Sequence, residues 1–495
     1  MREFRKKCGA SSRRPKRRQR LLRVERLEER LALDSQGALV GFDPHFTLSF
    51  AADGVAIARQ VNALTASFNA VAPEAVWREQ ILRAFQTWAI HTNADIGVVS
   101  DGGQAFGSPG ATQRDDRFGD IRIGAIAASP EVGAVSVPVD NFVSGTWLAD
   151  VLFNTQFGYQ SADEILAVAM HEAGNVFGLD DSTDPNSPLF TGGPPTVKNP
   201  TAADITALQA LHGSRAPDLN EAIGNYTDND SFTTATRLKL ADAAGGEGGS
   251  APTIVYGDVG SSGDVDFFYI ETPGDYTGPV TFQLRSSGIS LLQPDLTIYD
   301  AAQQPLEHLF SQDVGGAVLT VQLPGSTPQH LFYVRVAGAD PDEFGIGGYS
   351  LVTKFDGINL IDSAQIDAVA SGNYRFLPQD ELAKFFDADE TELFNDDGHS
   401  DDTAGLGVEL DSLPGFVANA RYEVTGSIAD ASDIDYYSIK SPQVAGNPLN
   451  VMTVAVRSLD VAGLIPKLTI LDEDQNPLAM EVVVNGGGEL VVQVT

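Results

Sequence analysis

The pattern of apolar and polar residues changes in character near Gly213. Before that residue, Ser161 and Glu164 have the spacing of a capping box, in which a hydroxyl and an acidic side chain bond free backbone amides at a helix start. The residues that follow are mostly apolar and would form the buried side of the helix: Ile165, Leu166, Val168, Ala169 and Met170. The sequence therefore predicts a helix that begins after Ser161.

After Gly213, short runs of β-branched and aromatic residues are separated by Gly, Pro, Asn and Asp, which is typical of an all-β sandwich. This region also contains an internal repeat with an offset of about 170 residues. The matching pairs are 256–259 with 425–428, 264–268 with 433–437, and 294–300 with 466–472. Ordered matches at nearly one offset indicate two copies of a β-module.

The stretch 171–182 reads HEAGNVFGLDDS and lies at the end of the predicted helix. In the pattern H-E-x-x-H-x-x-G-x-x-H, side chains four residues apart share a helix face and can grip one metal ion. The acidic residue beside the first histidine can take a proton from a metal-bound water. His171 and Glu172 fill these places, but Asn175 and Asp181 stand where the other two imidazoles belong.

With Gly178 at the turn, this stretch resembles the zinc site of matrixin-like metzincins, a family of zinc metallopeptidases. Residues 184–190 resemble the family's tight turn, with Leu189 in the place of its methionine, and residues 201–213 resemble its closing helix. Upstream, the matches are the first helix at 81–88 and sheet strands at 119–123, 145–147 and 150–153. The resemblance covers about residues 40 to 215 and implies an α+β domain in which a twisted mixed sheet supports the active-site helix.

The resemblance implies that Glu172 is the catalytic base and that the metal positions are His171, Asn175 and Asp181. Zinc prefers nitrogen or sulfur ligands; the carboxylate of Asp181 can serve, but the amide oxygen of Asn175 is a weak ligand. The site is thus expected to bind zinc weakly or not at all, to support weak peptidase activity, or to prefer a harder ion such as calcium. Three further histidines are interpreted as surface or capping residues: His45, His91 and His212.

The two β-modules resemble pre-peptidase C-terminal domains, which lie beside secreted bacterial peptidases. The features that carry this resemblance are the acidic opening 228–230, Gly257 before the Asp-Val-Asp-aromatic strand, and the closing residues 348–351. Asp264 and Asp266 alternate with Val265, so they share one face of the sheet. They either line a solvated strand edge or bind calcium together with loop acids such as Asp228 and Asp230.

The expected fold class is therefore multidomain: a metzincin-like α+β domain followed by two all-β sandwich modules. The expected parts are a basic N-terminal segment at 1–35, the peptidase-like domain at 36–215, the first sandwich at 216–356, a linker at 357–395 and the second sandwich at 396–495. The repeat aligns Thr495 with Pro324, which leaves two strands of the first module without counterparts. The second sandwich is thus expected to be incomplete, with an exposed edge.

Charge is divided unevenly along the chain. The first 30 residues hold 13 Lys or Arg and 4 Glu, whereas the whole chain carries a net charge of −35. Such an acidic surface repels nucleic acid. Residues 21–34 resemble an N-terminal motif of large bacterial exported proteins; the alternative is a short charged amphipathic helix. The single cysteine, Cys8, excludes an intramolecular disulfide, and no apolar run is long enough for a transmembrane helix.

Two functions follow from these patterns. The first is an exported, zinc-dependent metalloendopeptidase homologue acting on proteins or peptides, weakly active or inactive because Asn175 and Asp181 replace zinc-ligand histidines. The alternative is a non-catalytic extracellular or cell-surface protein that uses its β-modules to contact a surface or matrix partner. Fold alone does not certify activity, so the ligand set at Asn175 decides between them.

Overall fold

All described residues of the computed structural model belong to one compact unit, Ser35–Thr495. The structure describes residues 45–108, 115, 117–136, 149–193, 196–221, 228–238, 253–272, 276–325 and 330–355, and then 403–410, 422, 424, 434–440, 451–457, 467–473, 475–486 and 489–494. The basic segment at 1–35, the linker at 357–395 and the strand expected at 145–147 lie outside the described residues.

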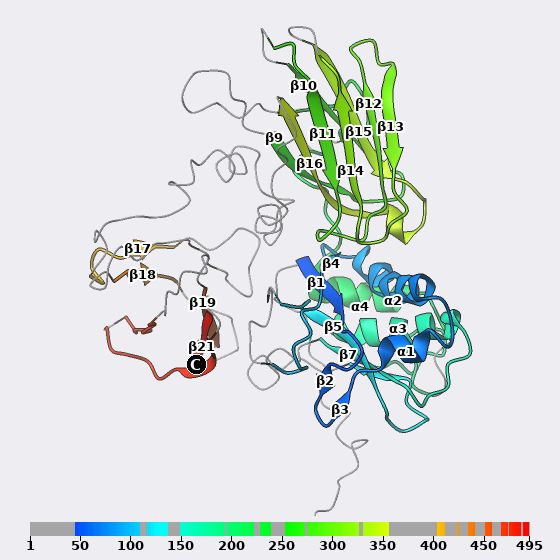
Figure 1. The fold of residues 1–495 in the computed structure, drawn as a ribbon, viewed down its shortest axis with the longest axis vertical. Helices are drawn as coiled ribbons and strands as arrows, with labels where there is room; N and C mark the ends of the chain where they lie inside the picture. Colours follow the sequence, from blue (N-terminus) through cyan, green and yellow to red (C-terminus); the bar gives the residue numbers. More distant parts are fainter. Residues whose placement is uncertain are drawn as a thin grey trace, which may run out of the picture. The chain divides into compact units, whose positions relative to one another are not determined.

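The N-terminal part of the described chain is built on a five-stranded mixed sheet (Figure 1). Its strands, in spatial order, are β4 (Asp95–Val98), β1 (His45–Phe50), β5 (Ile121–Ile126), β7 (Val151–Asn154) and β6 (Ala134–Ser136). The first four strands run parallel to one another, and β6 at the edge runs antiparallel to β7. Parallel neighbours need crossover connections, which here include helices. A separate small hairpin joins β2 (Ala56–Ile57) and β3 (Gln60–Val61).

The described residues around this sheet include four helices: α1 (Leu64–Phe68), α2 (Glu74–Ala89), α3 (Ala162–Val176) and α4 (Ala202–His212). α2 and α3 pack together, and the indole nitrogen of Trp88 donates to the carbonyl oxygen of Met170 over 2.9 Å. Gly174 permits this closeness, because a Cβ atom there would lie 2.7 Å from Leu189 and 2.9 Å from the Trp88 ring. Both helices contribute buried side chains to one core with the sheet.

The helix predicted to begin after Ser161 is α3. The Ser161 side chain accepts a hydrogen bond from the backbone amide of Glu164, as the capping pattern predicts. The Glu164 carboxylate bonds the amide of Gln160 rather than that of Ser161, so only half of the capping box forms. Gly178 has a φ of +90°, the left-handed conformation that ends the helix. α4 has a complete capping box between Thr201 and Asp204.

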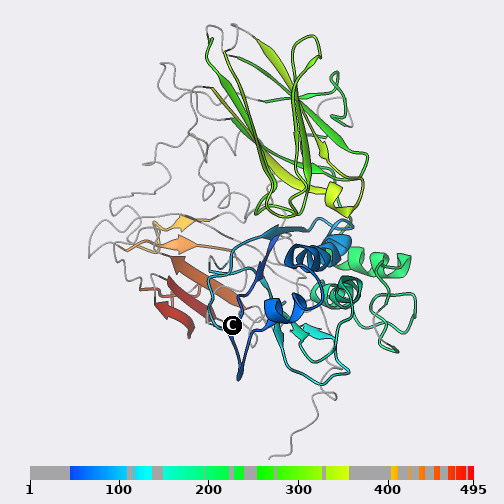
Figure 2. The ribbon, with the colours of Figure 1, turned by 45° about the vertical axis from the view of Figure 1, so that its right-hand side comes forward.

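The region after α4 contains two facing antiparallel sheets (Figures 1 and 2) that share one apolar core. One sheet has the order β13 (Pro305–Phe310), β12 (Pro294–Tyr299), β15 (Leu331–Gly338), β10 (Val265–Glu271) and β8 (Thr236–Arg237), with only β8 parallel to its neighbour. The other has the order β14 (Val318–Leu323), β11 (Val280–Arg285), β16 (Gly347–Phe355) and β9 (Thr253–Val259). A short 3-10 helix, η3 (Glu343–Gly345), precedes β16. This is the β-rich module predicted from the sequence.

The sequence repeat is visible in the strand pairing of the second β-module. Its strands in the described residues are β17 (Val408–Glu409), β18 (Tyr437–Ser438), β19 (Met452–Arg457), β20 (Glu481–Gly486) and β21 (Glu489–Val494). β19 pairs antiparallel with β21, as β11 does with β14, and β17 pairs parallel with β18, as β8 does with β10. β21 also pairs with β20, whereas β14 has only β11 as a neighbour among the described strands. Two pairings of the first module thus recur in the second.

Arg215 lies in the segment that follows α4, between the mixed sheet and the first sandwich. Its guanidinium group forms ion pairs with Asp95 of β4, at 3.0 Å, and with Asp258 of β9. All three side chains are almost fully buried. A buried charge needs a partner in low dielectric surroundings, and the single charge of Arg215 is shared between the two carboxylates.

Candidate functional site

The motif residues lie in and after the last turns of α3. His171 and Asn175 are both half-buried on one face of the helix, as their spacing predicts. Glu172 is buried and accepts hydrogen bonds from Ser136 of the edge strand β6. Burial raises the pKa of Glu172, although the charge of His171 and the bonds from Ser136 oppose the rise.

Both nitrogens of the His171 imidazole face oxygen atoms. Nδ1 lies 3.0 Å from the carbonyl oxygen of Pro188, and Nε2 lies 3.4 Å from Oδ1 of the half-exposed Asp181. Burial lowers the pKa of His171, but the interactions with Asp181, Glu172 and Pro188 outweigh it, so the net shift is upward. The structure thus brings His171 and Asp181 together, with the carboxylate next to the nitrogen that a metal would need.

The turn beneath this site is formed by residues 184–190. Leu189, which stands in the place of the methionine of the resembled family, is buried and packs against α3 at Gly174. The backbone amide of Leu189 donates a hydrogen bond to the Ser187 hydroxyl, and that hydroxyl in turn donates to the Asp204 carboxylate of α4. The turn is therefore fixed from both sides, and it presents the Pro188 carbonyl to His171.

These residues do not fit a catalytic zinc ion. Such an ion takes three protein ligands, usually imidazole nitrogens, with a water in the fourth position. Only His171 supplies a nitrogen here, and Asn175 has only a neutral amide. Among the described residues, no trio of His, Cys, Asp or Glu ligand atoms gathers around His171. His212 does not complete the set, because its Nε2 lies 2.7 Å from the Phe177 carbonyl oxygen.

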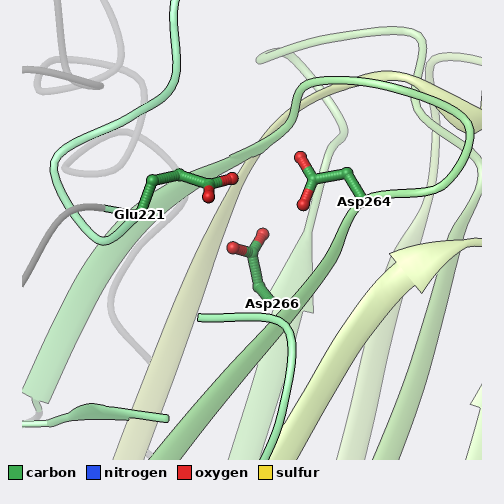
Figure 3. Close-up of side chains that lie close together, drawn as sticks. All are labelled: Glu221, Asp264 and Asp266. Carbon is green, nitrogen blue, oxygen red and sulfur yellow. The ribbon is translucent and has the colours of Figure 1, made fainter. Parts of the chain in front are cut away.

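A different cluster of possible ligands lies in the first β-module (Figure 3). Carboxylate oxygens of Glu221, Asp264 and Asp266 all lie within 4.8 Å of one another. The sequence pattern had paired Asp264 with Asp266 correctly, but a solvated edge is the wrong description of Asp266, which is fully buried. The sequence pattern did not include Glu221. The only feature of the sequence that points to Glu221 is a second acidic residue, Asp218, three positions earlier.

Burial and mutual repulsion act on all carboxyl groups of this cluster. Burial, reinforced by the charges of Asp264 and Asp218, raises the pKa of Glu221 to about 8. Burial also raises the pKa of Asp264 to about 6, with Asp230 adding to the rise, and it raises that of Asp266 well above its ordinary value. The hydrogen bond from Gly260 partly opposes the rise at Asp264. Ionisation of the whole group is therefore unfavourable at neutral pH, and the raised pKa values of Glu221 and Asp266 favour their protonated forms.

Comparisons with known proteins give little that bears on either site. No family model and no curated protein matches the chain. Among solved structures, the crystal structure of the pre-peptidase C-terminal domain of collagenase from Bacillus anthracis is similar to part of it, at 15% sequence identity and a TM-score of 0.17. That match covers 24% of this chain and 94% of the other. No helix among the described residues has the length and apolar character to cross a membrane.

Proposed function

We propose that this chain is an exported homologue of matrixin-like metallopeptidases that has lost hydrolytic activity and acts through binding. The single observation that carries the proposal is the environment of His171. Its Nε2 faces the Asp181 carboxylate at 3.4 Å, and the residue one helical turn later is Asn175. Since His171 is the only nitrogen ligand that the described residues bring to this site, the residues required to activate a water are incomplete.

The surrounding architecture supports descent from a peptidase scaffold. A mixed sheet packs against the helix that carries the motif, that helix ends at a glycine with positive φ, and a tight turn lies below it. Glu172 is held by Ser136 of the edge strand, so the position of the proposed base is kept although the ligands are not. The β-modules then supply the surface for a cell-surface or matrix partner.

Activity can be tested on the full chain with a fluorescently labelled, unstructured protein such as casein, in buffer supplemented with zinc. We expect the wild type to release no more fluorescence than Glu172→Ala, because neither protein can form a zinc-activated water. The Glu172→Ala variant is the matched control for trace contaminating proteases. Zinc-dependent cleavage by the wild type that disappears in Glu172→Ala would overturn the proposal and favour an active endopeptidase.

A further inference from the structure

The outer strand of the mixed sheet, β4, lies directly against loops of the first sandwich. A Cβ atom on Gly97 of β4 would lie 2.1 Å from the carbonyl oxygen of Gly288. A Cβ atom on Gly315 would lie 2.4 Å from the side chain of Val98. The Gly288 carbonyl oxygen also lies 3.0 Å from Nε2 of His45 in β1. Larger residues at these glycines would force the two parts apart, so the close approach depends on them.

Two residues of the sandwich loops complete the apolar core of the mixed-sheet region, which extends from β1 to α4. Leu291 and Phe344 are fully buried and belong to the same core as α2, α3 and the mixed sheet. The guanidinium carbon of Arg83 in α2 lies 4.6 Å from the centre of the Phe344 ring. If the sandwich moved away, both apolar side chains would be exposed to water, which is unfavourable.

Polar side chains of α2 also bind the 3-10 helix η3 and its flanks. Arg83 forms ion pairs with Asp342, at 3.1 Å, and with Glu343. The buried Gln86 donates hydrogen bonds to the carbonyl oxygens of Glu343, at 3.0 Å, and Ile346, at 2.6 Å. A buried amide needs such partners, and here they come from the sandwich rather than from the region that contains α2.

Contacts between domains of one chain are usually polar and modest in size, so that the domains move relative to each other. Here the contact combines a shared apolar core with the bonds of Gln86 and the buried ion pairs of Arg215. We propose that the mixed-sheet region and the first sandwich form one rigid body that unfolds as a unit, with α2 and β4 as the docking surface for the sandwich.

A rigid connection determines where a partner of the first sandwich would be held. Such a partner would keep one position relative to α3 and its motif residues, instead of being carried on a flexible tether. The sandwich would thus be a fixed part of the mixed-sheet region and not an independent module. This inference goes beyond the proposed function and does not depend on it, because it concerns rigidity and not catalysis.

Urea unfolding of the full chain tests the proposal, because all three tryptophans of the sequence precede the sandwich. Trp77 and Trp88 are fully buried in α2, so tryptophan fluorescence reports on the mixed-sheet region. Val334→Ala removes buried methyl groups from the sandwich core. We expect it to lower the urea midpoint of the tryptophan transition by about 0.3 M or more, because the two parts unfold together.

The matched control is Val492→Ala, the same change at an equally buried valine in the apolar cluster of the second module. It should leave the tryptophan midpoint unchanged. Hydrogen exchange of peptides from β15 shows separately that Val334→Ala loosens the sandwich. The proposal is wrong if β15 exchanges faster in Val334→Ala while the tryptophan midpoint stays at the wild-type value, or if the two valine variants shift it equally.

A second set of variants tests whether the coupling passes through the α2 surface. In a Phe344→Ala background, the midpoint shift caused by Val334→Ala should fall to less than about half, because the shared core is weakened. Glu343→Gln keeps the size of the side chain but removes its charge beside Arg83, and it should act in the same direction more mildly. An undiminished shift in both backgrounds would contradict α2 as the docking surface.

Discussion

The sites around His171 and Asp266 differ in how clearly the sequence marks them and in how many possible metal ligands lie together in space. Around His171 the sequence motif is conspicuous, but the described residues supply one imidazole, one carboxylate at 3.4 Å and an amide. Around Asp266 the motif is slight, yet three carboxylates lie within 4.8 Å and one buried oxygen has no partner. A motif in the sequence and a cluster of possible ligands in space are therefore separate kinds of information.

A second comparison shows why convergence matters more than burial. Asp150 and Asp266 are both fully buried, and each has one oxygen without a hydrogen-bond partner. Asp150 accepts a bond from the Arg122 amide and lies close enough to feel the charge of Arg122. Asp266 instead faces two other carboxylates. Only the second arrangement gathers several anionic ligands at one point.

The largest effect is expected from restoring ligands at the motif. In the double variant Asn175→His and Asp181→His, three imidazoles would occupy the pattern, and Glu172 and the turn at Gly178 are already in place. Loss of outer-shell partners alone costs about 10–100-fold in metal affinity, so gaining two direct ligands should tighten zinc binding ~100-fold or more. Zinc titration against a colorimetric chelator measures this gain.

The matched control is the same double variant with His171→Ala, which should lose the gained zinc. A folded double variant that binds zinc no better than the wild type would show that the backbone around α3 has drifted from the geometry that a zinc ion needs. That result would not bear on the acidic cluster of the first module, because the two sites share no residue.

A smaller effect is expected from pH. Burial raises the pKa of Asp150 well above its ordinary value, although the amide and charge of Arg122 oppose the rise. A raised pKa in the folded state means that stability is full below the ordinary carboxyl pKa and is lost as pH rises through the folded pKa. Each unit of pKa difference corresponds to about 1.4 kcal/mol.

Asp150→Asn should therefore lose less stability than the wild type when the pH rises from about 5 to about 8. Urea unfolding of the two proteins at the two pH values gives the comparison. A pH dependence equal in the two proteins would contradict the raised pKa.

The local features of the fold could be predicted from the sequence. Ser161 marked the start of α3 and Gly178 its end, since both act through bonds and dihedral angles within a few residues. The repeat predicted two copies of a β-module, and two strand pairings of the first module recur in the second.

The sites could be predicted only in part. The i, i+4 rule placed His171 and Asn175 on one helix face, but the contact of His171 with Asp181 depends on the path of the loop after Gly178. Glu221 was missed because its approach to Asp264 and Asp266 depends on tertiary folding of a segment that has no regular spacing. Periodicity reports on neighbours within one element and not on such encounters.

The most direct test of the proposed function is the zinc content of the full-length protein after equilibration with zinc and removal of the unbound ions. Mass spectrometric metal analysis should find no stoichiometric zinc in the wild type. Stoichiometric zinc that is lost in His171→Ala would contradict the proposal.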